Sequence, residues 1–300
     1  MIIWGFDVSS WQSQGSMLGN DRWDLSDLNR FPLEEMREHG CRFGIVKYSM
    51  QLGKDQTAED HTHYIESADM ETGGYHWCDP IANFNLQRDL FTEQIQDLEP
   101  VIQAYDVEQY WASWDDKTKI LSEDAIVDNF LYLFEETSGL SHNHLMYTAN
   151  WFINKYVPTR SSELNVCDGW YANYVFWRQY VQSNFRTYQL STWEQFHETL
   201  YWFYHNWRNF YDGSSPSRTL IPPGLDEPTI IQVDSKTKLP GCPYNIDLNV
   251  FNGSEKDYEE WFSGIENNGE EKTIPERLRN EAESIRISAG NIEGIANQIG

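Results

Sequence analysis

Short apolar segments alternate with helical patterns over the first 175 residues, and this alternation is the strongest constraint on the fold. The segments IIWGFDV (2–8), RFGIVKY (42–48) and GYHWC (74–78) have the length and composition of strands. Similar segments follow at 100–108, 145–149 and 169–174, and helical patterns lie between the strands at 24–39, 57–69, 82–97 and 122–137. Strands that alternate with helices predict parallel βα units.

Residues 175–228 interrupt this rhythm, and we interpret them as an insertion. The stretch 191–211 predicts one aromatic-rich helix, whose side chains could pack against the rest of the domain or form a wall of a substrate cleft. Residues 229–235 and 245–251 then supply two final strands. With at least six strands in one domain of this length, a barrel is favoured over an open sheet.

The chain changes character after Asn252, where it becomes polar and acidic. Residues 275–298 have the pattern of a helix. We therefore expect a barrel domain at 1–252 and an acidic linker with a helix at 253–300. This tail is a candidate for contacts in an assembly or between copies of the chain.

Composition restricts the partners of the chain. A formal net charge of −25 repels phosphate backbones and anionic membranes, which disfavours nucleic-acid binding. No run approaches the roughly 18 apolar residues that a membrane helix needs, and the N-terminus lacks the basic region of a secretory signal. Aromatic residues reach 15%, which is typical of sugar-binding clefts and equally of a thick aromatic core.

The most informative local motif is Asp106–Val107–Glu108, at the end of a predicted strand. Residues i and i+2 of a strand point to one face, with Cα atoms about 6.5 Å apart. Two carboxyl groups on one face raise each other's pKa, so one can stay protonated while the other is ionised. Glycosidic cleavage uses such a pair, although metal binding is an alternative for two neighbouring acids.

Two more acids stand at strand ends. Asp7 leaves the first apolar strand, and Asp247 interrupts the apolar run of the last one, where it needs a partner or an aqueous cleft. These acids would meet Asp106 and Glu108 only if the strands close into a barrel. The histidines are scattered and no HExxH motif or phosphate-binding glycine-rich loop occurs, so we expect no metal and no organic cofactor.

Seven segments occur together in an order that resembles one family. They are GFDVSSWQ (5–12), FGIVKYSMQLGKD (43–55), GGYHWCDP (73–80), PVIQAYDVE (100–108), MYTANWF (146–152), GWYANY (169–174) and the pair IIQVDSKTKLPG and NIDLNVFNG within 230–253. In these motifs the chain resembles the glycoside hydrolase family 25 lysozymes, the Chalaropsis-type muramidases common in phage endolysins. The resemblance covers about residues 2–252.

The resemblance implies an α/β fold, an irregular TIM-like (β/α)5(β)3 barrel that here carries the aromatic-rich insertion and the polar tail. It also implies a peptidoglycan hydrolase that cuts the β-1,4 bond between N-acetylmuramic acid and N-acetylglucosamine. Glu108 matches the general acid and Asp106 its partner, while Asp7 and Asp247 match flanking acids. Positions that line the family's sugar groove are matched by Tyr75, Trp77, Tyr147, Trp170, Tyr171 and Gln232.

The seventh strand departs from the family pattern, which has Trp-Gln-Tyr where this chain has Ile231, Gln232 and Val233. Two aromatic side chains are therefore missing beside the expected cleft. Three functions follow as hypotheses: an active muramidase, a non-catalytic sugar-binding or virion component on the same barrel, and a hydrolase of another amino-sugar polymer. The first would act outside the cell at the bacterial wall, after release by phage lysis or as part of a virion.

Overall fold

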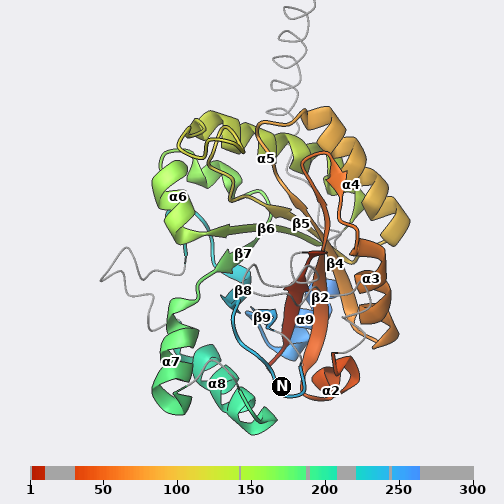
Figure 1. Cartoon of the computed structure of the whole chain (residues 1–300), viewed down its shortest axis with the longest axis vertical. Helices are drawn as coiled ribbons and strands as arrows, with labels where there is room; N and C mark the ends of the chain where they lie inside the picture. The colour runs from red at the N-terminus through yellow and green to blue at the C-terminus, as the bar shows by residue number, and fades with distance from the viewer. Residues whose placement is uncertain are drawn as a thin grey trace, which may run out of the picture.

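The computed structural model describes residues 2–10, 31–141, 143–186, 190–207, 221–242 and 245–263 (Figure 1). Eight strands form a closed barrel whose hydrogen-bonded order is β1, β9, β8, β7, β6, β5, β4 and β2, and the β1–β2 pairing closes the ring. The strands are β1 (Trp4–Val8), β2 (Cys41–Met50), β4 (Glu71–Trp77), β5 (Ile102–Asp106), β6 (Asn143–Ala149), β7 (Asp168–Ala172), β8 (Pro228–Asp234) and β9 (Asp247–Phe251). All eight predicted strands are present, and the predicted α/β barrel is confirmed.

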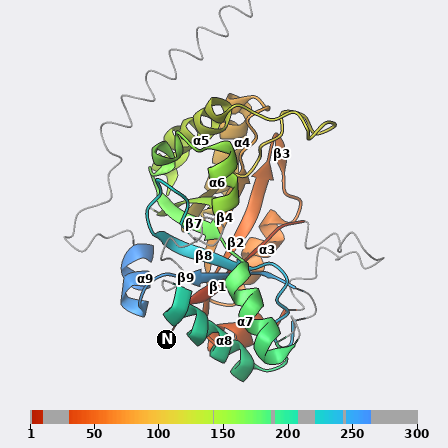
Figure 2. The same ribbon diagram turned by 90° about the vertical axis from the view of Figure 1, so that its left-hand side faces the viewer.

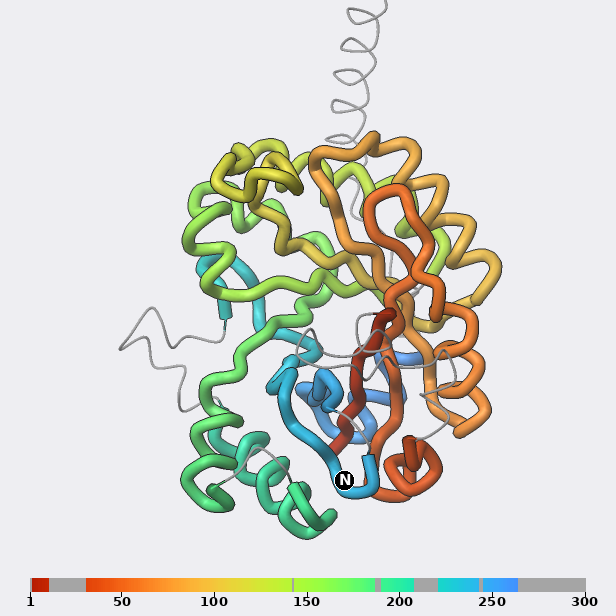
Figure 3. The backbone as a smooth tube through the Cα atoms, viewed as in Figure 1, coloured from red at the N-terminus to blue at the C-terminus, as the bar shows by residue number. Residues whose placement is uncertain are grey.

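The last strand gives the barrel its irregular character. Strands β1, β2 and β4 to β8 pair in parallel, whereas β9 runs antiparallel to both of its neighbours, β1 and β8. Closure of the barrel places β1 and β9, the first and last strands of the described chain, side by side (Figure 3). The short strand β3 (Gly53–Lys54), which the sequence did not predict, pairs with the end of β2.

Helices cover the outside of the barrel (Figures 1 and 2). They are α2 (Leu33–Glu38), α3 (Ala58–Ser67), α4 (Phe84–Leu98), α5 (Glu123–Thr137), α6 (Asn150–Tyr156), α7 (Val175–Phe185), α8 (Trp193–Asn206) and α9 (Glu255–Phe262), with 3-10 turns η2 (Ser138–Leu140) and η3 (Ser161–Leu164). Their ends follow local chemistry: Ser122 caps α5 by accepting a hydrogen bond from the backbone of Ala125. No helix in these described ranges is long and apolar enough to cross a membrane.

Alternation along each strand divides the apolar side chains into two cores. On β5, Ile102 and Ala104 face the barrel interior, while Tyr105 packs outward under the helices. The interior residue that follows Ala104 at a spacing of two is Asp106, at the end of the strand. The same period therefore builds an apolar barrel centre and places polar groups at its carboxyl-terminal end.

The insertion forms two helices rather than the single helix predicted. Helix α8 matches the predicted segment as far as the described residues extend, whereas α7 was missed, as was α6. Figures 1 and 2 show α7 and α8 side by side, and Tyr180 of α7 stacks on Trp202 of α8 with centroids 4.2 Å apart. Phe196 of α8 packs on Trp4 of β1 at 4.7 Å, so aromatic side chains of the insertion pack against the barrel.

The described chain continues past the expected barrel boundary at residue 252. Helix α9 begins with a capping box formed by Ser254 and Asp257. Its buried Tyr258 joins the interior core, with its ring 5.3 Å from that of Phe251. The predicted helix at 275–298 and the first part of that predicted at 24–39 lie outside the described residues.

The backbones of β1 and β2 approach each other closely at Gly5. A Cβ atom at this position would lie 2.4 Å from the carbonyl oxygen of Phe43 and 2.5 Å from its ring. We expect Gly5→Ala to lower the free energy of unfolding by about 1–3 kcal/mol, because backbone must shift to relieve the contact. The control is Gly139→Ala, whose Cβ would meet nothing within 4 Å. Equal midpoints of thermal unfolding for the two variants would contradict this explanation.

Candidate active site

The four predicted acids meet at one end of the barrel. Asp7 and Asp106 stand at or near the carboxyl ends of β1 and β5. Asp247 begins β9, and because β9 runs antiparallel to β1, its first residue pairs with Asp7. Glu108 follows β5 by two residues. Barrel closure therefore brings together acids that are up to 240 positions apart, as the sequence analysis required.

The acid pair shares one face because the chain stays extended beyond β5. The backbone nitrogen of Val107 donates to the carbonyl of Tyr147 at 2.9 Å, and the carbonyl of Val107 accepts from the hydroxyl of Thr148 at 2.9 Å. Val107 packs in the outer core, so its neighbours Asp106 and Glu108 turn to the opposite side. Glu108 lines a pocket of about 770 Å³ that extends over the ends of β6 and β7.

Asp7 is held by several hydrogen bonds. Its Oδ2 atom accepts from the side-chain amides of Gln232 at 2.7 Å and Asn249 at 2.9 Å. A further hydrogen bond joins its carboxyl group to that of Asp247. The Oε1 atom of Gln232 in turn accepts from the hydroxyl groups of Tyr147, at 2.9 Å, and of Tyr174. Gln232 is thus a buried link between Asp7 and two tyrosines of the barrel end.

Burial raises the pKa of all four carboxyl groups. The pKa of Asp7 rises to about 6 and that of Glu108 to about 7. The pKa of Asp106 lies well above its ordinary value because of burial and then the charge of Glu108. The same is true of Asp247, because of burial and then the charge of Asp7. Near neutral pH, protons are therefore available within this cluster for transfer to a substrate.

Lys47 is a site residue that sequence reasoning missed. Its buried side chain follows Phe43 and Ile45 at a spacing of two, on the interior face of β2. The Nζ atom lies 5.6 Å from the ring centroid of Tyr75 and 5.4 Å from that of Trp77. Burial lowers the pKa of Lys47, whereas the charges of nearby acids, first Asp106, raise it. A lysine at an interior position of an apolar strand was the available sequence signal.

The predicted aromatic residues separate into three groups. Tyr75, Tyr147 and Trp170 belong to the interior core, where Tyr147 and Trp170 meet edge to face at 4.7 Å. Trp77 is partly exposed at the end of β4, and its indole nitrogen donates to Gln109 at 3.2 Å. Tyr171 packs in the outer core, on the opposite face of β7 from Trp170. The structure therefore does not bring Tyr171 to the acids.

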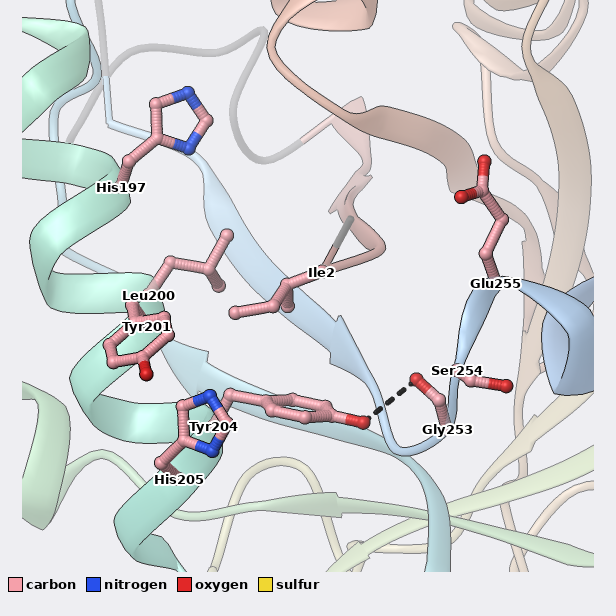
Figure 4. A pocket seen from close by; sticks show the side chains of 9 residues that line it. All are labelled: Ile2, His197, Leu200, Tyr201, Tyr204, His205, Gly253, Ser254 and Glu255. Carbon is pink, nitrogen blue, oxygen red and sulfur yellow. Dashed lines mark hydrogen bonds between the residues drawn. The ribbon is translucent and has the colours of Figure 1, made fainter.

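Another pocket lies at the opposite end of the barrel (Figure 4). It measures about 480 Å³ and is bordered by α8, the start of β1 and the turn into α9. The hydroxyl of Tyr204 donates to the carbonyl of Gly253 at 2.9 Å across one edge of it. Among its lining residues the one carboxyl group is that of Glu255, so this pocket lacks the acid pair that glycosidic cleavage needs.

Comparisons with known proteins agree with this geometry. The model of the family "Glycosyl hydrolases family 25" matches residues 6–202. A muramidase from Trichobolus zukalii is 19% identical with a TM-score of 0.57, covering 88% of this chain and 100% of its own. The bacterial lysozyme from Streptomyces coelicolor is 16% identical with a TM-score of 0.57, covering 87% and 97%.

A phage protein shares the fold as well. The catalytic domain of endolysin ply40 from bacteriophage P40 of Listeria monocytogenes is 14% identical with a TM-score of 0.53, covering 87% of this chain and 98% of its own. At such identities the likeness to solved structures establishes the fold alone. No curated protein matches the chain.

The raised pKa of Asp247 predicts how the free energy of unfolding depends on pH. The folded chain holds a proton that the unfolded chain releases above about pH 4, so the free energy of unfolding falls as pH rises through this range. In Asp247→Asn the amide can still donate to Asp7 but does not titrate. We expect this variant to lose less stability than the wild type between pH 4 and pH 8, measured by urea unfolding.

The control for this measurement is Asp60→Asn, at an exposed position of α3. It should retain the pH dependence of the wild type. If Asp247→Asn and Asp60→Asn lose the same stability between the two pH values, the buried carboxyl of Asp247 does not hold the proton assigned to it.

Proposed function

The chain belongs to family 25 of the glycosyl hydrolases, and from this premise we propose that Glu108, Asp106, Asp7 and Asp247 form the catalytic centre of a muramidase. The enzyme hydrolyses peptidoglycan at the β-1,4 bond between N-acetylmuramic acid and N-acetylglucosamine. The observation that carries the assignment of residues is the cluster of four carboxyl groups at one end of the barrel, of which Asp7, Asp106 and Glu108 interact with the charge of Lys47. Its test is the loss of wall hydrolysis when the proton donor is removed.

Glu108 is the proposed general acid. A pKa of about 7 keeps a large share of Glu108 protonated at neutral pH, and the group lines the open pocket where a glycan can reach it. It would donate its proton to the glycosidic oxygen as the bond to the muramic acid carbon breaks. Proton donation avoids the release of an unstable alkoxide, and positive charge develops on the sugar ring.

Asp106 is the proposed partner on the same face. Its Oδ1 atom is buried and accepts no hydrogen bond from any residue that the structure describes. An oxygen in this state can accept a hydrogen bond from the substrate's acetamido N–H or from the attacking water. Both roles stabilise the positively charged sugar, and the ring acetamido group would make the distance between carboxyl groups a poor guide to stereochemistry.

Asp7 and Asp247 are proposed to position the reacting groups. Their shared hydrogen bond and the amides of Gln232 and Asn249 fix the carboxyl groups at the end of the barrel. The charge of Asp7 also raises the pKa of Glu108, which helps to keep the acid protonated. Gln232 then serves substrate binding indirectly, through its hydrogen bonds to Tyr147 and Tyr174.

The pocket beside Glu108 has the chemistry of a sugar site. Trp151 presents an indole that is 55% exposed, and Tyr147 and Tyr174 lie deeper. Amide side chains complete the lining at Asn150, Asn154 and Asn173. Its volume of about 770 Å³ is within the usual range for ligand sites. We therefore assign one flank of the glycan strand to this pocket.

Peptidoglycan lies outside the cytoplasmic membrane, so we propose that the enzyme acts at the bacterial cell wall. A phage endolysin domain shares the fold, and we propose delivery by phage lysis or as part of a virion. A contact of the 253–300 tail with a phage assembly or with a second copy remains a prediction, since residues 264–300 lie outside the described part of the chain.

The assignment of Glu108 is tested by Glu108→Gln, which keeps the shape of the side chain but cannot donate the proton. We expect hydrolysis of peptidoglycan to fall about 10²- to 10⁴-fold, the usual contribution of a general acid. Mass spectrometry of digests should show muropeptides that end in reducible N-acetylmuramic acid with the wild type and almost none with the variant. The matched control, Glu59→Gln on the exposed face of α3, should digest like the wild type.

Three outcomes would contradict the proposal. Unchanged hydrolysis by Glu108→Gln would remove the general acid from this residue. Binding of the wild type to several wall types without any soluble product would favour a non-catalytic sugar-binding or virion component. Products that end in N-acetylglucosamine would instead point to another bond or another amino-sugar polymer.

A further inference from the structure

We propose that the loop between β5 and α5 carries a second substrate subsite, in which Lys117 binds a carboxylate of the muramoyl units. This inference rests on the proposed function, because it concerns the same glycan strand on the other side of Glu108. The sequence analysis gave no role to this loop, and the pocket beside Glu108 does not include it. The inference stands on a row of indole rings, on the hydrogen bonds that fix the row, and on the charge beside its two outer rings.

Three tryptophan rings lead away from the acid cluster. Trp77 lies beside the ammonium group of Lys47, and its ring centroid is 6.3 Å from that of Trp111. Trp111 meets Trp114 edge to face at 5.0 Å. The indole of Trp114 is 40% exposed, which is unusual for so large an apolar group. Trp111 is itself buried, so Trp77 and Trp114 are the rings of the row that can stack against the apolar faces of sugar rings.

Hydrogen bonds hold this row in place before any ligand binds. Asp79 accepts from the side-chain amide of Gln109 at 2.7 Å and from the indole nitrogen of Trp114 at 3.3 Å. Gln109 accepts in turn from the indole nitrogen of Trp77 at 3.2 Å. Trp111 forms an antiparallel bridge with Ile120 across the base of the loop. Because the site is preformed, its side chains lose less conformational entropy when a glycan binds.

Lys117 places a positive charge beside the two outer rings of the row. Its Nζ atom lies 4.4 Å from the ring centroid of Trp111 and 5.4 Å from that of Trp114. No described carboxyl group forms an ion pair with Lys117, whereas the neighbouring Lys119 pairs with Asp116 at 3.8 Å. The ring contacts orient the ammonium group and leave its N–H donors available to an acceptor.

The strand order sets the direction of the bound glycan. Trp77 ends β4, Glu108 follows β5, and the pocket with Trp151 lies over β6 and β7. Trp77, where the row begins, and the pocket therefore flank Glu108 on opposite sides in the order of the strands. A glycan strand that crosses Glu108 would place sugar rings on both flanks.

The ligand class follows from the charge. The ammonium group of Lys117 favours a carboxylate over a neutral sugar hydroxyl, because hydrogen bonds between ionised partners are the stronger ones. Each muramic acid carries a lactyl group, which ends in a carboxylate when bare and otherwise bears a peptide with its own carboxylates. Chains of N-acetylglucosamine carry neither. The subsite would thus distinguish peptidoglycan from chitin-like polymers.

The test measures binding of soluble ligands by calorimetry in the Glu108→Gln background, so that the ligand is not consumed. Three ligands of equal sugar length are compared: peptide-bearing glycan fragments, fragments stripped of peptides, and oligomers of N-acetylglucosamine. We expect Lys117→Gln to weaken binding of at least one carboxylate-bearing ligand about 10-fold at low salt, and less at high salt. Binding of the neutral oligomer should stay unchanged.

Controls separate the charge from the rings. Lys119→Gln removes a lysine of the same loop and should leave all three affinities unchanged. Trp114→Ala should weaken all three ligands, since stacking does not depend on a carboxylate. If Lys117→Gln weakens binding of both carboxylate-bearing ligands, the group that Lys117 binds is the lactyl carboxylate. If it weakens binding of the peptide-bearing ligand alone, the group is a carboxylate of the peptide.

The proposal is overturned if Lys117→Gln affects none of the ligands, affects the neutral oligomer equally, or behaves like Lys119→Gln. These results do not depend on turnover. Failure of the proposed function would be seen separately, as absence of cleavage by the wild-type enzyme in the mass-spectrometric digest.

Discussion

Four carboxyl groups share the end of the barrel interior with the ammonium group of Lys47, and the arrangement of the site depends on this crowding. Burial raises the pKa of each acid, and the charges of neighbouring acids raise that of Asp106, Glu108 and Asp247 further. Ionising all four would place several negative charges in a poorly solvated space. The positive charge of Lys47 lowers the pKa of Asp7, Asp106 and Glu108. The balance leaves protons in the cluster at a pH where a glycosidase can use them.

The closed barrel makes this balance possible. Strand β9 runs against its neighbours, and this direction places Asp247 opposite Asp7. Below the acids, aromatic rings fill the interior, and the indole nitrogen of Trp170 donates to Asn249 at 2.8 Å. Tyr258 of α9 packs at the far end. Polar groups therefore gather at one end, and the loops after β5 and β6 build the two flanks of the cleft above them.

The strands could be predicted from the sequence, and so could the position of the four acids at strand ends, because apolar segments of strand length carry these carboxylates at or near their ends. The direction of β9 could not be predicted, since periodicity does not reveal pairing. Helix α7 was missed because only Phe176, Trp177 and Val181 of its residues are buried, so its apolar face is too short to show a clear 3.6-residue period. Two side chains differ from the prediction because alternate residues of a strand face opposite sides. Lys47 was overlooked although it shares the interior face with Ile45, and Tyr171 was expected in the groove although it faces away from Trp170.

The central claim is that burial raises the pKa of the clustered acids and that the charge of Lys47 limits this rise. It is tested most directly by the pH dependence of kcat/KM for the wild type and Lys47→Met. In the wild type, activity should fall as pH rises through about 7, when Glu108 loses its proton. Without the lysine charge the pKa of Glu108 rises, so the alkaline limb should move to higher pH in a variant that still unfolds cooperatively. An alkaline limb at the same pH in both proteins would contradict the account.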